Sequence, residues 1–232
     1  MTQLHLLSGG AAFGLVSKLQ DRFTADTGCT ISGTYNAVGA MRDQLLAGAP
    51  CDVVILTAAL IAQLEASGHV VAGSARALGT VKTGVAVKAG EAAPAVSTPD
   101  ELKAALRAAA GIYFPDPVKA TAGIHFMNVL KQLGIDAEVA GRLRPFPNGA
   151  TAMAAMAANS EPCLVGCTQV TEILYTPGVQ LVAPLPREFE LATVYTAAVN
   201  SRAASPQAAT ALIDLLASAG AAPLRRAGGF ED

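Results

Sequence analysis

The sequence predicts an α/β protein in which short buried strands alternate with helices. Apolar runs of strand length recur along the chain, and most are followed by a glycine turn or a proline and then by a helical pattern. In the run DVVIL at 52–56, Asp52 is followed by four apolar residues in a row, which is typical of a strand in a parallel sheet covered on both faces. This alternation favours parallel sheets with helices on both faces.

Each element follows from its local pattern. The first helix is predicted because Leu15, Leu19 and Phe23 recur at helical spacing after the Ser8-Gly9-Gly10 turn. Thr98 precedes a proline and two acids, which is a helix start. The predicted strands are residues 4–7, 30–35, 52–56, 81–87, 111–114, 163–168, 179–183 and 191–199. The first predicted helix ends at residue 23, and another starts at residue 98. The remaining predicted helices are residues 40–46, 58–67, 121–133, 149–158, 170–174 and 206–217.

Composition excludes several classes of function. Hydrophobic residues make up 52% and charged residues 15% of 232 residues, which is ample for a core and argues against disorder. The net charge is −2 without a basic block, so nucleic acid is a poor partner. The four cysteines lack zinc-site spacing, and buried free thiols are favoured over two disulfides. We therefore expect no metal and no cofactor.

The chain carries no segment that predicts membrane insertion or export. Residues 1–10 have no basic region and a short apolar run, so they predict a strand rather than a secretory signal. No run is long enough to span a bilayer. We expect the chain as given to be cytoplasmic, or periplasmic if a leader has been removed from it.

Four stretches of the sequence are specific in combination: LLSGGAAFG at 6–14, AGAPCDVVIL at 47–56, DPVKATAGIHFMNVLKQLG at 116–134 and GCTQVTE at 166–172. In these stretches and in their order, the chain resembles the molybdate-binding family of type II periplasmic solute-binding proteins. The resemblance implies two α/β lobes, residues 1–81 plus 196–232 and residues 84–193. It also implies a two-strand hinge near 81–84 and 192–196, closure over a ligand, and an ABC importer as partner for an exported form.

Turns before helices are the strongest signal for a binding site, because helix N-termini offer unpaired N–H groups and partial positive charge. Tight turns without a ligand are the alternative. Molybdate binders present hydroxyls in the first two turns, where this chain has Ala11 and Val38, and Gln169 replaces their tyrosine. The candidate ligand-binding residues are Ser8, Gly9, Gly10, Ala11, Tyr35, Val38, Gly39, Ala40, Arg42, Thr57, Lys82, Thr83, Lys119, Thr121, Gly123, Asn148, Gly149 and Gln169.

These substitutions favour a planar carboxylate ligand over molybdate, unless Ser8 and Thr121 supply the missing hydroxyls. Arg42 suits a carboxylate through two parallel hydrogen bonds, although a solvated surface arginine is the alternative. We expect the chain to bind a small di- or tricarboxylate in a crevice between lobes.

The alternative function is a cytoplasmic isomerase, because proteins resembling this family interconvert trans- and cis-aconitate. Its candidate catalytic residue is Lys82, with Asp116, His125 and Glu172 also considered. His125 is also explained as a structural histidine and Asp116 as a turn residue. Whether the chain is an enzyme stays open at this point.

Overall fold

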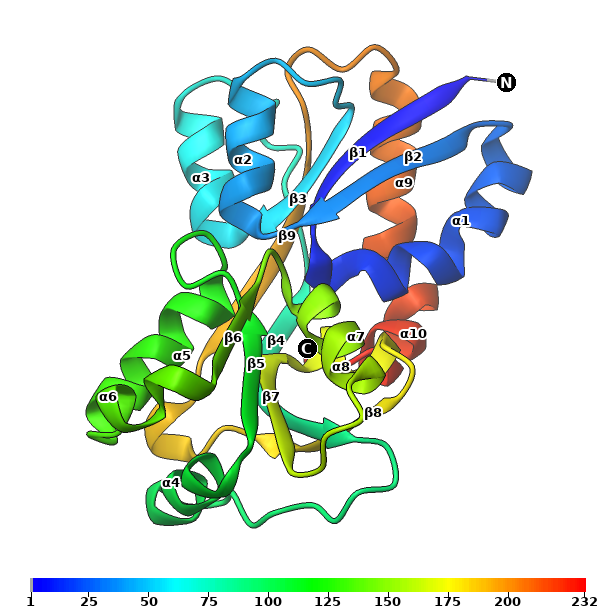
Figure 1. The fold of residues 1–232 in the computed structure, drawn as a ribbon. Helices are drawn as coiled ribbons and strands as arrows, with labels where there is room; N and C mark the ends of the chain where they lie inside the picture. Colours follow the sequence, from blue (N-terminus) through cyan, green and yellow to red (C-terminus); the bar gives the residue numbers. More distant parts are fainter. Residues whose placement is uncertain (1) are drawn as a thin grey trace. The chain divides into compact units, whose positions relative to one another are not determined.

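The structure is a computed structural model that describes residues 2–232, and its chain forms two compact units. Unit 1 consists of Met1–Val81 and Thr193–Asp232, and unit 2 of Lys82–Ala192. The chain passes from one unit to the other within β4 (Arg76–Lys88) and near the start of β9 (Ala192–Val199). Each unit contains a sheet with flanking helices, so the predicted α/β class is confirmed (Figure 1).

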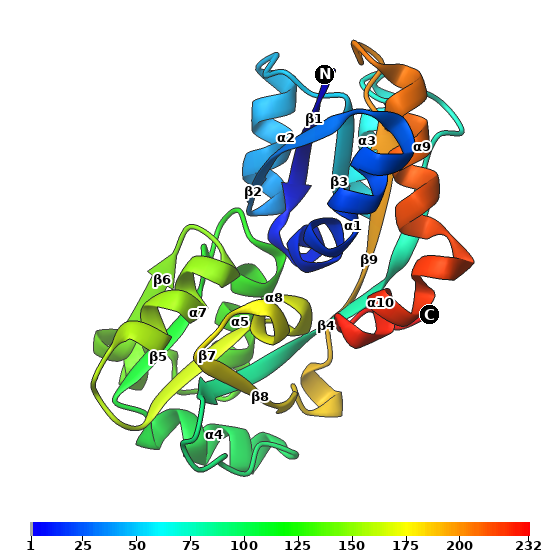
Figure 2. The ribbon, with the colours of Figure 1, turned by 90° about the vertical axis from the view of Figure 1, so that its right-hand side faces the viewer.

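The sheet of unit 1 has the strand order β2-β1-β3-β9. β1 (Gln3–Gly9) pairs in parallel with β2 (Thr30–Asn36) and β3 (Val53–Thr57), whereas β9 pairs antiparallel with β3. Helices α2 and α9 lie on opposite sides of this sheet in both views (Figures 1 and 2). The helices of unit 1 are α1 (Phe13–Thr27), α2 (Val38–Leu46), α3 (Ala58–Ala66), α9 (Pro206–Ala217) and α10 (Ala222–Ala227), with 3-10 turns η1 (Gly10–Ala12) and η4 (Ala219–Ala221).

Burial on both faces explains the apolar strand at the centre of unit 1. All five residues of β3 are buried, and Leu4, Leu6 and Phe23 join them in the core. Helices cover both sides of this sheet, so a continuous apolar run is stable there.

One polar residue, Asp52, holds the loops at the start of β3. Its side chain is buried and accepts hydrogen bonds from the backbone N–H groups of His5 (2.8 Å) and Ser205 (3.0 Å). We expect Asp52→Ala to lower the free energy of unfolding by about 2–3 kcal/mol, because two partly buried backbone donors lose their charged acceptor. Urea titration measures this loss. Asp26→Ala is the control, because Asp26 is exposed and pairs with Arg22 at the surface; equal effects would contradict the prediction.

The sheet of unit 2 has the order β4-β7-β5-β6, with β8 (Val179–Pro184) also paired to β4. β5 (Gly111–Pro115) runs parallel to β6 (Leu143–Phe146) and β7 (Leu164–Gln169), while β4 is antiparallel to β7 and β8. The helices of unit 2 are α4 (Pro99–Ala108), α5 (Thr121–Gln132), α6 (Asp136–Val139), α7 (Gly149–Ala158) and α8 (Val170–Tyr175), with 3-10 turns η2 (Ala140–Arg142) and η3 (Arg187–Phe189).

Alternation along β5 divides the core of unit 2 between two faces. Ile112 and Phe114 pack with Phe126 of α5, whereas Tyr113 packs with Met153 and other residues of α7 and α8. Successive strand residues point to opposite faces, so a single short strand anchors helices on both sides. Figure 1 shows α5 and α7 on opposite sides of β5. The same alternation decides which residues of β4 face the candidate site.

Three features depart from the sequence expectation. β4 begins at Arg76, five residues before the predicted start, and α6, β6 and α10 were not predicted at all. The sheets are mixed rather than wholly parallel, because β4, β8 and β9 run antiparallel to their neighbours. Short or partly exposed elements such as β6 lack the apolar run on which the prediction relied.

Candidate functional site

The carboxyl ends of the parallel strands of unit 1 bring several predicted residues to one edge. Register pairs Ser8 with Tyr35 and with Ile55, and Gly9 with Asn36. The last residue of β3 is Thr57, which accepts a hydrogen bond from the N–H of Leu60 and caps α3. Open α/β sheets bind ligands at this edge.

The first glycine turn is tightly packed. The Ser8 hydroxyl is buried and donates to the carbonyl of Gly9 at 2.8 Å. A Cβ added at Gly9 would lie 2.7 Å from Val38 Cγ1 and 3.0 Å from Tyr195, so glycine is required here for packing. Gly10 and Ala11 are buried in η1, which leads into α1.

The second turn, residues 36–40 before α2, lacks a capping hydroxyl as predicted, but its arginine already has a partner. No side-chain hydroxyl caps α2, whose N-cap is Ala37, and the Asn36 side chain accepts from the Ala37 N–H at 2.8 Å. Val38 is buried, while Gly39 and Ala40 are half-buried. The Arg42 guanidinium donates to Asp43 at 2.8 and 3.2 Å, and its side chain is 39% exposed. The guanidinium therefore already serves one carboxylate of the chain through two of its nitrogens, Nε and Nη2.

In unit 2, the parallel strands β5, β6 and β7 lead directly into the starts of α5, α7 and α8. Before α5, the Asp116 carboxylate accepts from the N–H groups of Val118 (2.7 Å) and Lys119 (2.9 Å). Lys119 is exposed and Thr121 half-buried. Asp116 therefore fixes this turn. A Cβ at Gly123 would collide with the carbonyl oxygens of Pro115 and Asp116, so Gly123 allows α5 to pack against the end of β5.

An internal carboxylate lies at the start of α7. Glu172 of α8 is buried and accepts hydrogen bonds from the N–H groups of Gly149, Ala150 and Gln169. The Thr168 hydroxyl also donates to it, at 2.5 Å. Burial raises the pKa of Glu172 to about 7, and these hydrogen bonds lower it in part. The turn at Asn148 and Gly149, predicted to bind an anion, thus contains a carboxyl group of the chain itself.

Asn148 caps the same helix. Its side chain accepts from the N–H of Thr151 at 2.9 Å, and the Thr151 hydroxyl oxygen accepts from the N–H of Asn148 at 3.3 Å. This capping box satisfies donors that Glu172 does not reach. The amides of the first turn of α7 are therefore used mainly within the fold.

A second set of polar groups in unit 2 differs from the amides of α7, because folding leaves these groups without hydrogen-bond partners among the described residues. Thr83 Oγ1, both side-chain polar atoms of Gln169 and Thr171 Oγ1 are buried without a hydrogen-bond partner among residues 2–232. Thr83 and Gln169 face each other across the β4–β7 register and are 1% and 3% exposed. Directly opposed residues project from the same face of a sheet. A buried polar group without a partner costs about 1–3 kcal/mol, so this cluster is a binding-site candidate.

The neighbouring candidate residues on β4 and α5 have partners of their own. Lys82 precedes Thr83, so its side chain points to the other face of the strand. The Lys82 ammonium pairs with Glu190 at 3.1 Å, and its side chain is 25% exposed. The His125 ring bonds the Phe189 carbonyl at 2.7 Å, in line with a structural histidine. Sequence reasoning missed Thr171, because a hydroxyl early in a short helix is ordinarily a capping group.

The described residues contain no cluster that could hold a metal ion, and all four cysteines are free. Two of these thiols, those of Cys51 and Cys167, are buried as predicted, and burial raises the pKa of Cys51 to about 12. Cys163 is exposed and Cys29 half-buried, in contrast to the expectation. Within residues 2–232, no single helix has the length and apolarity to cross a membrane. The bent helix pair Pro206–Ala217 and Ala219–Ala227 meets these two criteria only when both helices are taken together.

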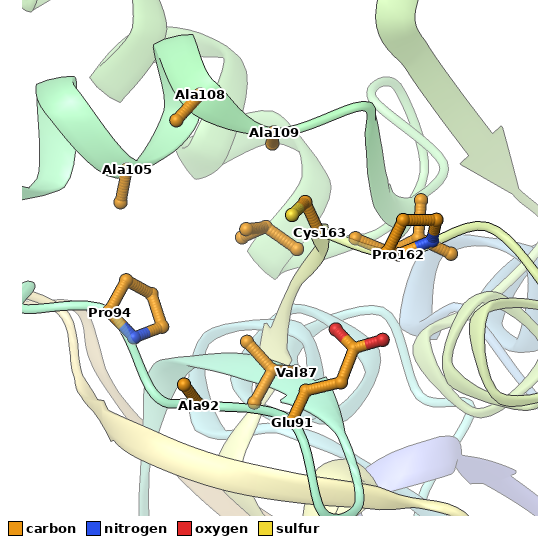
Figure 3. Close-up of a pocket in the computed structure, with 11 residues that line it drawn as sticks. Val87, Glu91, Ala92, Pro94, Ala105, Ala108, Ala109, Pro162 and Cys163 are labelled. Carbon is orange, nitrogen blue, oxygen red and sulfur yellow. The ribbon is translucent and has the colours of Figure 1, made fainter.

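A separate apolar pocket of about 350 Å³ lies at the other end of β7 (Figure 3). It is lined by Leu164 and Val165 at the start of that strand, together with Cys163 and residues of α4. Glu91, its charged lining residue, pairs with Lys88 at 3.0 Å. This pocket has no converging polar groups and lies far along β7 from Gln169, so it is not the candidate site.

The comparison with family models decides the family. Residues 4–231 match the model of the bacterial extracellular solute-binding proteins. The chain belongs to this family. Its structure superposes on the periplasmic molybdate-binding protein of Azotobacter vinelandii with a TM-score of 0.82, at 18% identity and 99% coverage of both chains. The predicted type II periplasmic-binding fold is thus confirmed, as is the resemblance on which it rested.

Two further relatives bear different names. The sulfate-binding protein SubI of Mycobacterium tuberculosis H37Rv superposes with a TM-score of 0.75 at 20% identity, over 99% of this chain and 86% of that one. An aconitate isomerase from a Pseudomonas species is 28% identical over 228 residues, which is 96% of this chain and 85% of that protein. This member of the solute-binding family is therefore similar both to binders of inorganic anions and to an enzyme.

Proposed function

We propose that this protein binds a small di- or tricarboxylate, and that Thr83 and Gln169 of unit 2 contact it. The observation that carries the proposal is the pair of buried, directly opposed side chains without partners. Hydroxyl and amide donors form strong hydrogen bonds to an ionised oxygen, which would offset their burial cost. The closure of two lobes over the ligand, with its hinge, stays a prediction, as does an ABC importer as partner.

Two features favour a carboxylate over molybdate or sulfate. Ala11, Ala37 and Val38 provide no hydroxyls in the turns of unit 1, and the Ser8 hydroxyl already donates to Gly9. The relative named aconitate isomerase is named for a tricarboxylate. Thermal-shift screening of di- and tricarboxylates against molybdate, tungstate, sulfate and phosphate tests the proposal. We expect stabilisation by a carboxylate; a large shift with molybdate alone would refute it.

Replacing Thr83 separates binding from stability. We expect Thr83→Val to weaken carboxylate binding by about tenfold, because one donor to the ligand is lost. The ligand-free variant should be at least as stable as the parent, since valine removes a buried hydroxyl that has no partner at similar volume. Calorimetric titration and thermal melting measure the two effects. Thr210→Val, at an exposed position of α9, is the control; equal affinities of both variants would contradict the contact.

The alternative is an isomerase acting on an unsaturated polycarboxylate, favoured by the 28% identity to aconitate isomerase. Such a reaction removes a proton from one carbon and returns a proton to another as the double bond shifts, so no external oxidant is required. Lys82 stays the predicted base, and deprotonating it would require breaking its ion pair with Glu190. Ultraviolet absorbance with trans-aconitate tests turnover, and Lys82→Met should abolish it. Binding without turnover by the parent chain would favour the first proposal.

A further inference from the structure

The carboxamide of Gln169 constrains the chemistry of the ligand further. Its nitrogen offers two donors, but its oxygen can only accept. Neither atom has a partner among residues 2–232, and Gln169 is 3% exposed. We infer that the ligand carries an O–H donor beside its anionic oxygens, and that Gln169 selects for it. This inference rests on the proposed anion-binding function and narrows its ligand class.

The neighbouring groups do not remove this requirement. Thr83 lies directly across the strand pair and its hydroxyl could donate, yet it makes no hydrogen bond to Gln169. The Gln169 backbone N–H donates to Glu172, so that carboxyl group is engaged with the main chain. Exchanging the amide oxygen and nitrogen leaves the same requirement, because both positions lack a partner. One buried acceptor therefore remains for the ligand to satisfy.

An anion with acceptors only would leave that oxygen unsatisfied. Sulfate, molybdate and a fully ionised dicarboxylate such as succinate can bond the amide nitrogen but cannot donate to the amide oxygen. A site built to bond a hydroxyl rejects the analogue that lacks it, because its polar group is then buried unpaired. A hydroxyl group and an acid proton on the anion are two sources of the same donor.

Two matched pairs of ligands distinguish these sources. Malate differs from succinate by a hydroxyl group, and phosphate at pH 7 differs from sulfate by an acid proton. Calorimetric titration of the full chain gives the dissociation constant of each. In whichever pair binds, we expect the member that carries the O–H donor to have a dissociation constant lower by about tenfold or more. Preference within the first pair assigns the donor to a hydroxyl, and within the second to an acid proton.

The variant Gln169→Leu removes the acceptor at similar volume. We expect it to bind both members of the pair within about twofold, with Gln169→Met as a second variant if the first melts early. Equal binding of both members by the parent chain would overturn the inference while leaving anion binding intact. A preference that persists in the variants would overturn the role of Gln169. If none of the tested anions binds at millimolar concentration, the proposed function itself fails.

Discussion

Gly149→Ala is expected to lower the free energy of unfolding by about 3 kcal/mol or more, which is a large effect for one methyl group. The added Cβ would collide with Thr168 Oγ1 and with the Glu172 carboxylate. These atoms are buried and hydrogen-bonded to one another, so neither can move aside without losing its partner. The backbone itself tolerates alanine, because the Gly149 φ is not positive.

A matched glycine in the same unit provides the control. Nothing lies within 4 Å of a Cβ added at Gly141, which is exposed and has no positive φ. We expect Gly141→Ala to change the urea midpoint little, whereas Gly149→Ala should shift it far toward lower concentration. Similar midpoints for both variants would mean that the Glu172 carboxyl group is not held against α7.

The polar groups predicted to bind an anion in unit 2 form two sets, one at the start of α7 and one at the end of β7. A helix N-terminus attracts negative charge, and at α7 the carboxyl group of Glu172 supplies it from within the chain. At the end of β7, by contrast, the side chains of Gln169 and Thr83 have no partner. The second position is where an external ligand would gain most, because it would satisfy groups that folding leaves unsatisfied.

Local signals in the sequence predict most elements of the fold. The bounds of α7 and α9 match their predicted ranges, since the first follows the Pro147-Asn148 turn and the second begins with Pro206. Thr98 caps α4 in a capping box with Glu101, as the order of residues there indicates. The antiparallel course of β4 and β9 could not be predicted, because strand direction depends on the path of the whole chain.

The candidate site was less accessible from sequence than the fold. Gln169 was proposed from its position in the family pattern, but its burial without partners arises from packing that no local motif encodes. The bond between Glu172 and the start of α7 is likewise a tertiary contact. The pairing of Arg42 with Asp43 did have a signal, since an adjacent acid is visible in the sequence.

Glu172→Ala should be as destabilising as the glycine replacement, at about 3–5 kcal/mol. It would leave three backbone N–H groups and the Thr168 hydroxyl without their shared acceptor and would open a cavity beside α7. Chemical denaturation measures the loss. Exposed Glu138, which pairs with Arg107 at the surface, is the control position; Glu138→Ala should cost less than about 1 kcal/mol.

Glu172 should also make stability depend on pH. Burial raises its pKa from 4.5 to about 7 in the folded chain, so the folded state holds this proton over a range in which the unfolded chain releases it. Its contribution to stability is therefore complete below pH 4.5 and is lost as the pH rises through about 7. Glu172→Gln cannot titrate, so the stability difference between parent and variant should shift against the parent over this range. Parallel pH profiles of the two proteins would show that the carboxyl group is already ionised at the start of α7, held there by its amide donors despite burial.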